Sequence, residues 1–166
     1  MHYGSIVDQE QRRQFVRDHR ICVFGYNRRE HGPAMTVVYY LMDGDDLLIS
    51  SMAARGKPKA VDRDGRVSLC ILDEQWPLGY LQVYGTAVVC RDRELAADVL
   101  AGVIGVMAGE EVPESRRPQI EKMADDEDRV VIRVTPYATF ETPPRHVYQM
   151  SDIDTLTHFT STSMPW

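Results

Sequence analysis

Six short stretches rich in β-branched and aromatic residues, separated by polar connections, dominate this chain. Two of them, Arg66–Asp73 and Tyr80–Cys90, alternate apolar and polar side chains with the period of a half-buried strand. Because the connections after the first two stretches are short, the first three are expected to pair as consecutive antiparallel strands. This succession favours a mainly β domain built as a small barrel. The predicted strands are Ile21–Asn27, Ala34–Met42, Leu47–Met52, Arg66–Asp73, Tyr80–Cys90 and Arg129–Thr135.

Helices are expected at the margins of this barrel. The polar segment Asp8–His19 suits a short amphipathic helix that caps one end. The segment Arg91–Met107 is rich in Ala and Gly, which permit close packing against the sheet. Shorter helices are predicted within Ala53–Asp62 and over Pro118–Ala124.

The length of 166 residues fits one well-buried domain. We expect residues 1–150 to form this domain and residues 151–166 to form a C-terminal tail. The tail ends in Trp166, so we expect it either to fold back or to lie on a partner.

The charge balance argues against two classes of partner. With 19 Lys and Arg against 25 Asp and Glu, the net charge of -6 provides no general attraction to nucleic acid or to an anionic membrane surface. The apolar segment Leu95–Met107 is shorter than the roughly 20 residues that span a bilayer. These features predict a cytoplasmic protein with no nucleic-acid or membrane partner.

The cysteines and histidines show no metal-binding spacing. Cys22, Cys70 and Cys90 stand singly in apolar stretches and are interpreted as free thiols. The five histidines are scattered, so no metal held by protein ligands alone is expected. A single histidine remains compatible with axial ligation of a haem.

The loop after the third predicted strand is the richest in functional residue types. Ser50 and Ser51 end the strand, and Arg55, Gly56 and Lys57 follow at the predicted start of a helix. Cations, a glycine and free backbone N–H groups at a helix start favour phosphate binding. The chain has only 3 Lys, two of them in this loop, which favours a functional over an incidental basic loop.

The order of these segments resembles the pyridoxamine 5'-phosphate oxidase-like split β-barrel superfamily, and within it the flavin/deazaflavin oxidoreductase B group. The resemblance rests on the strand segment Thr36–Tyr40, the segment Ile49–Ser51, the basic residues Arg55–Lys57, and the strands Arg66–Leu69 and Tyr80–Ala87. It extends from about Gln14 to Met150 and includes His146, Val147 and Tyr148.

This resemblance implies a homodimer with a flavin-type cofactor at its interface. Arg55 and Lys57 are then expected to bind the cofactor phosphate, with Gly56 between them, and Ser50 and Ser51 to flank the ring or the ribityl chain. In addition, Thr36, Val37 and Val38 are expected along the ring plane, and Trp76 and Tyr80 to come from the other subunit. For Trp76, a purely local packing role is equally open.

Two departures from the family pattern bear on function. Pro58 and Lys59 stand where many members have an Arg-Asn pair, which leaves the contacts beyond Lys57 open. The chain has only Pro144–His146 where a true pyridoxamine phosphate oxidase carries a C-terminal Arg/His motif. The resemblance therefore argues against that particular activity.

The function that this resemblance implies is hydride transfer from reduced coenzyme F420 to a small unsaturated substrate. Such a reaction needs proximity and exclusion of water more than a side-chain base. The proton is assigned to solvent or to Tyr148, and the sequence does not identify the substrate. An FMN-dependent oxidase or reductase and a non-enzymatic flavin or haem carrier are the alternatives.

Overall fold

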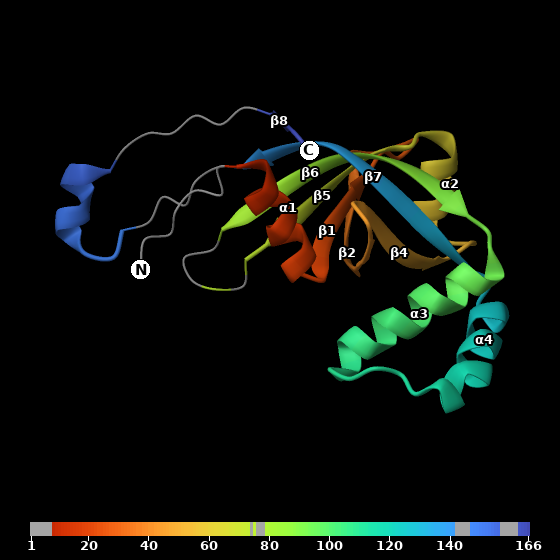
Figure 1. Cartoon of the computed structure of the whole chain (residues 1–166). Helices are drawn as coiled ribbons and strands as arrows, with labels where there is room; N and C mark the ends of the chain where they lie inside the picture. Colours follow the sequence, from red (N-terminus) through yellow and green to blue (C-terminus); the bar gives the residue numbers. More distant parts are fainter. Residues whose placement is uncertain (1–7, 74, 76–78, 142–146, 157–162) are drawn as a thin grey trace.

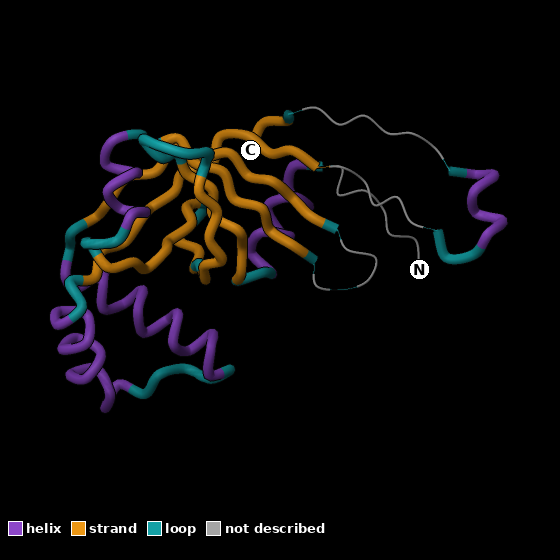
Figure 2. Tube along the Cα trace, turned by 180° about the vertical axis from the view of Figure 1, so that it is seen from behind, coloured by secondary structure: helices purple, strands orange, loops and turns teal. Residues whose placement is uncertain are grey.

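The computed structural model describes residues 8–73, 75, 79–141, 147–156 and 163–166, and their strands form one curled antiparallel sheet (Figure 1). Seven strands follow the order β2-β1-β5-β6-β7-β4-β3, and β8 pairs with β7. Figure 2 shows the same sheet from behind. The strands are β1 (Ile21–Tyr26), β2 (Ala34–Tyr39), β3 (Leu41–Asp43), β4 (Asp46–Met52), β5 (Arg66–Leu72), β6 (Tyr80–Cys90), β7 (Arg129–Glu141) and β8 (Met164–Pro165).

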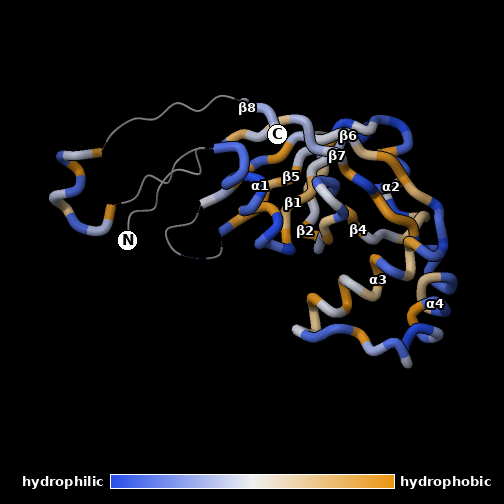
Figure 3. The backbone as a smooth tube through the Cα atoms, viewed as in Figure 1, coloured by the Kyte–Doolittle hydropathy of each residue, from blue (hydrophilic) through white to orange (hydrophobic). Residues whose placement is uncertain are grey.

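Helices surround this sheet, which confirms the mainly β split barrel with peripheral helices. The α-helices are α1 (Gln9–Asp18), α2 (Gly56–Arg63), α3 (Arg93–Ala108) and α4 (Arg117–Asp126), and the two 3-10 helices are η1 (Glu114–Arg116) and η2 (Met150–Thr155). Figure 3 shows that α1 is largely hydrophilic, as expected for a helix at the barrel surface. None of the helices in the described ranges combines the length and apolar character needed to cross a membrane.

The predicted strand Ala34–Met42 divides at Tyr40 into two strands, although both expected antiparallel pairings, with the strand before it and the strand after it, are present. β2 pairs with β1, whereas β3 pairs with β4, which also pairs with β7. The Tyr40 side chain is fully buried, and its hydroxyl donates to the Val16 carbonyl oxygen at 2.7 Å. Tyr40 therefore fixes the junction between the two edge strands of the curled sheet, an arrangement that the local strand pattern does not encode.

Replacing Tyr40 by phenylalanine removes this buried hydrogen bond and leaves the Val16 carbonyl oxygen without its donor. We expect the free energy of unfolding to fall by about 1–2 kcal/mol, because an unpaired buried acceptor retains its desolvation cost. Denaturant titration measures the change. Tyr137→Phe is the matched control, since Tyr137 is exposed and should change stability by less than about 0.5 kcal/mol. Equal losses of unfolding free energy in the two variants would contradict a stabilising role for the Tyr40–Val16 hydrogen bond.

The core lies inside the curl of the sheet. Phe24, Leu69 and Val83 are opposite one another on β1, β5 and β6, and all three are fully buried. On the outer side, α3 packs against β4 and β7 through Val99 and other small residues. Gly102 permits this approach, because a Cβ atom there would collide with the Leu41 side chain. The close packing predicted for this helix is thus confirmed.

The end of the tail folds back onto its own chain as β8. Thr139 of β7 is paired with Met164, and the Trp166 side chain packs against the core. Two arginines of α1 hold this end. Arg12 donates to the Pro165 carbonyl oxygen at 2.8 Å, and Arg13 donates to that of Trp166 at 3.0 Å. The helix therefore ties the returning chain to the barrel end.

Candidate cofactor site

The start of α2 forms a small cradle of positive charge. Arg55 is the N-cap residue, has an extended backbone and makes no side-chain capping bond. The N–H groups of Gly56 and Lys57, in the first turn, have no partner within the helix, and Pro58 has no N–H. The cradle therefore offers two backbone donors and two cationic side chains to an anion.

The cradle is held in place from both sides. The Ala53 N–H donates to the Asp128 carbonyl oxygen at 2.8 Å, and the Arg55 N–H donates to that of Met52 at 3.1 Å. On its inner face, α2 buries Pro58 and Val61 against the sheet. A loop fixed in this way presents its donors without a large ordering cost on binding.

Lys57 is half-buried and lies near a second cation. Burial lowers the pKa of its ammonium group, and the charge of Arg55 lowers that pKa further. Among the described residues, no carboxylate forms an ion pair with Lys57 or Arg55. A partly desolvated cation without a counterion is a site at which a phosphate is stabilising.

The two serines that precede the cradle point to opposite faces of β4. Ser51 is buried on the core face, and its hydroxyl has no hydrogen-bond partner. Ser50 accepts a hydrogen bond from Arg129 at 3.2 Å on the outer face. The Ser50 hydroxyl accepts this bond and keeps its own O–H as a donor, whereas the Ser51 hydroxyl has no partner in the described chain.

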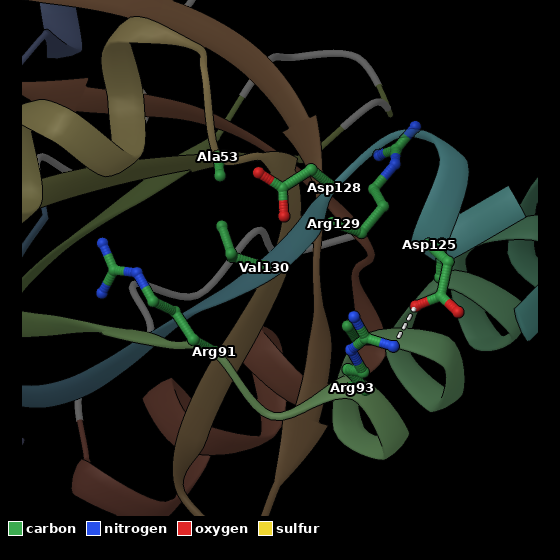
Figure 4. Close-up of a pocket in the computed structure, with 9 residues that line it drawn as sticks. Ala53, Arg91, Arg93, Asp125, Asp128, Arg129 and Val130 are labelled. Carbon is green, nitrogen blue, oxygen red and sulfur yellow. Dashed lines mark ion pairs between the residues drawn. The ribbon is translucent and has the colours of Figure 1, made fainter.

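Arg129 also lines a cavity of about 220 Å³ beneath Ala53 (Figure 4). Arginines and acidic side chains line it together, and Arg93 pairs with Asp125 at 3.6 Å. Arg91 pairs with Asp62, and Arg129 donates to Glu127. The cations of this cavity are already neutralised, which distinguishes it from the cradle.

On β2, the expected ring-binding residues divide between two faces. Thr36 and Val38 lie opposite the core residues Phe24 and Cys22, whereas Val37 is 73% exposed on the outer face. The Thr36 hydroxyl is buried without a partner, like that of Ser51. Thr36 and Ser51 thus both have a buried hydroxyl group without a partner in the described chain.

Two predicted site residues lie away from the cradle in the single protomer. Tyr80 begins β6, whereas α2 adjoins the other half of that strand, where Ala87 bonds Gly65. Tyr148 is 65% exposed beside η2, which stands off the barrel on the side away from α2 (Figures 1 and 2). Trp76 is outside the described residues. The structure thus groups Ser51, Arg55, Gly56 and Lys57, but not these tyrosines.

A second basic feature adjoins the cradle and escaped the sequence interpretation. A groove of about 410 Å³ runs between the β1–β2 connection and one face of α2 and shares Gly56 with the cradle. Within the described chain, no carboxylate pairs with its cations Arg28, Arg29 and Lys59. The Arg28–Arg29 pair was a visible signal, but only the fold places it beside α2. The groove is lined by Tyr26, Arg28, Arg29, Glu30, His31, Gly56, Lys59, Ala60 and Arg63.

Metal-binding clusters of three or more His, Cys, Asp or Glu side chains are absent from the part of the chain that the structure describes. Cys22, Cys70 and Cys90 are free thiols. Burial raises the pKa of the Cys22 thiol to about 12, with a smaller contribution from Cys70, so Cys22 stays protonated and unreactive at neutral pH.

A comparison with known protein families identifies the family to which this fold belongs. The family described as pyridoxamine 5'-phosphate oxidase matches residues 8–142. The chain belongs to this family. The match confirms the resemblance inferred from the sequence, and a flavin-type cofactor is characteristic of the family. No curated protein matches the chain significantly.

Solved structures share the family fold at low identity. A conserved hypothetical protein of Mycobacterium tuberculosis has a TM-score of 0.71 at 19% identity, over 87% of this chain and 94% of its own. A protein described as an F420 reductase has a TM-score of 0.55 at 22% identity, over 72% and 88%. A heme binding protein from Mycobacterium smegmatis has a TM-score of 0.61 at 14% identity, over 99% and 60%. At these identities the likeness establishes the fold alone.

Proposed function

We propose that this chain is a cytoplasmic, homodimeric reductase that uses reduced coenzyme F420 to deliver a hydride to a small unsaturated substrate. The observation that carries the proposal is Lys57, a half-buried cation with a lowered pKa and no carboxylate partner among the described residues, at the free N–H groups of α2. The unpaired hydroxyl groups of Thr36 and Ser51 support a ring between β2 and the cradle.

The basic groove favours F420 over FMN. FMN carries one phosphate, which the cradle alone would satisfy. F420 carries a phosphodiester followed by a chain of carboxylates, and the groove continues from Gly56 along α2 with Lys59 and Arg63. A longer anionic cofactor therefore uses cations that FMN leaves unpaired. A solved structure with this fold is itself described as an F420 reductase.

The outer sheet face supports the homodimer. Met35 and Val37 of β2 are 74% and 73% exposed, and Leu72 of β5 is also exposed. Along the register, Val37 is opposite Val23, which is opposite Cys70, so apolar side chains continue across three strands. A contiguous apolar face of this kind is typical of a protein interface. In the proposed dimer, Trp76 and Tyr80 approach the site of the other subunit.

The residues of the chain then have distinct roles. Lys57, Arg55 and the Gly56 N–H hold the phosphate, and Thr36 and Ser51 orient the ring. The apolar face is covered by the second copy in the proposed dimer, and Tyr148 or solvent supplies the proton to the substrate. The cofactor, when bound, supplies the hydride from its deazaflavin ring.

Anaerobic mixing with reduced F420 and a panel of electron-poor alkenes and enones tests the activity. We expect the absorbance of oxidised F420 to appear only when protein and a suitable acceptor are both present. Reduced FMN is the parallel arm, because the FMN-dependent alternative uses the same cradle. Faster turnover with FMN would favour that alternative. Binding of either cofactor without oxidation by any acceptor would favour a carrier.

The lowered pKa of Lys57 predicts a pH dependence of cofactor affinity. Because the protonated ammonium binds the phosphate, affinity should fall as pH rises through this pKa, below the range of an ordinary lysine. Isothermal titration across the alkaline range, with proton uptake determined in two buffers, measures the effect. Lys57→Arg retains the charge at all these pH values and should flatten the profile. A wild-type profile as flat as that of Lys57→Arg would contradict the prediction.

A further inference from the structure

Residues 147–156, here named the arm, expose apolar side chains that the described part of the chain does not cover. Val147 is 37% exposed, Tyr148 65%, Met150 80% and Ile153 55%. A single exposed apolar side chain is ordinary, but four within seven residues form a concentrated patch. The patch therefore indicates an interaction surface.

The arm has its own local structure. The Asp152 carboxylate accepts hydrogen bonds from the Tyr148 N–H at 2.9 Å and from the Gln149 N–H at 3.1 Å. The Thr155 hydroxyl donates to the Asp152 carbonyl oxygen at 3.2 Å. These bonds stabilise η2 locally, and the arm stands apart from the barrel in both views (Figures 1 and 2). The arm thus presents a preformed apolar surface to something other than its own barrel.

The elements on either side of the arm are anchored at one place on the sheet. β7 ends at Glu141, and β8 returns to it through the pairing of Thr139 with Met164. Arg12 and Arg13 then hold the residues that follow. The described elements before and after the arm, β7 and β8, thus belong to the same edge of one sheet.

The surface that complements the arm is on β2 and the connection before it. Met35 and Val37 expose apolar side chains there, and Arg28 and Arg29 have no carboxylate partner among the described residues. The arm combines exposed apolar side chains with the exposed carboxylate of Asp154. Apolar surface with opposite charges on the two sides is the pattern of a complementary interface.

We infer that the arm of one protomer lies on β2 and the Arg28–Arg29 connection of a second copy of this chain. The inference rests on the proposed homodimer and adds which segment is exchanged within it. The contact brings Tyr148 of one copy to the outer face of β2 in the other, the face opposite to that of Thr36 and Val38.

A cross-linking experiment tests the geometry directly. The double variant Val37→Cys and Ile153→Cys should form a covalent dimer under mild oxidation, seen on a non-reducing gel. Each single variant should form no covalent dimer. The double variant Val37→Cys and Met107→Cys, in which the second cysteine is exposed on α3, should form none either. Mixing the two single variants should give one disulfide per mixed dimer. A disulfide within one chain, or no cross-link, would overturn the inference.

Sedimentation equilibrium tests how much the arm contributes to the stability of the dimer. Met150→Ser with Ile153→Ser should raise the dimer dissociation constant at least about tenfold, because two buried apolar contacts are lost. Met107→Ser is the control and should leave it unchanged. An unchanged dimer dissociation constant in the arm variant would overturn the inference. It would mean that the arm does not contact a second copy, and an arm that binds an unrelated protein or a membrane would give the same result. Cofactor titration of wild-type protein separately tests the proposed function, so failure of one remains distinguishable from failure of the other.

Discussion

Replacing Lys57 by alanine is expected to weaken binding of F420 or FMN by about 10- to 150-fold. A hydrogen bond to a charged group contributes about 1.5–3 kcal/mol, and about 1.4 kcal/mol corresponds to a factor of ten. The effect should be large for this lysine because it is half-buried and has no carboxylate partner in the described chain to pair with instead of the phosphate. Equilibrium titration monitored by cofactor fluorescence measures the change.

Two further variants separate this role from a general loss of positive charge. Lys57→Arg keeps the charge and should retain most of the affinity. Lys59→Ala removes a cation from the neighbouring groove and should weaken F420 binding while leaving FMN binding nearly unchanged. Equal losses for Lys57→Ala and Lys59→Ala with FMN would mean that the phosphate is held by diffuse charge and not by the cradle.

Gly65→Ala is expected to lower the free energy of unfolding by about 1–3 kcal/mol, the usual cost of overpacking. A Cβ atom at Gly65 would lie 2.6 Å from the Ala87 carbonyl oxygen. The backbone cannot easily move away, because the Ala87 N–H donates to the Gly65 carbonyl oxygen at 2.7 Å. Gly65 thus couples the end of α2 to β6, and denaturant titration measures the loss.

Gly32→Ala provides the matched control for this prediction. A Cβ atom at Gly32 meets nothing within 4 Å, and its φ is not positive. The substitution should be neutral or slightly stabilising, because alanine has less freedom in the unfolded chain. If both variants lost the same stability, the close approach at Gly65 would not be the cause.

The strands could be predicted where the pattern within one segment determines the structure. Arg66–Leu72 and Tyr80–Cys90 alternate buried and less buried residues as their sequences predict. The division at Tyr40 depends on a contact with Val16, 24 residues away. β8 depends on Arg12 and Arg13, which are 153 residues from their partners. Local patterns contain no signal for contacts of this range.

The candidate site shows the same limit. The cradle was predictable because Arg55, Gly56 and Lys57 are consecutive and lie at the start of a predicted helix. The opposite orientations of Ser50 and Ser51 follow from strand alternation. The groove was missed because Arg28 and Arg29 come from a hairpin connection that only the fold places beside Lys59.

The most direct test of the account is a thermodynamic cycle between Lys57 and the cofactor phosphate. The affinities of FMN and of riboflavin, which lacks the phosphate, are measured on wild-type protein and on Lys57→Ala. We predict that FMN binds the wild type about 10- to 150-fold more tightly than riboflavin does, and that most of this difference disappears in Lys57→Ala. An equal preference for FMN in both proteins would contradict the assignment of Lys57 to the phosphate.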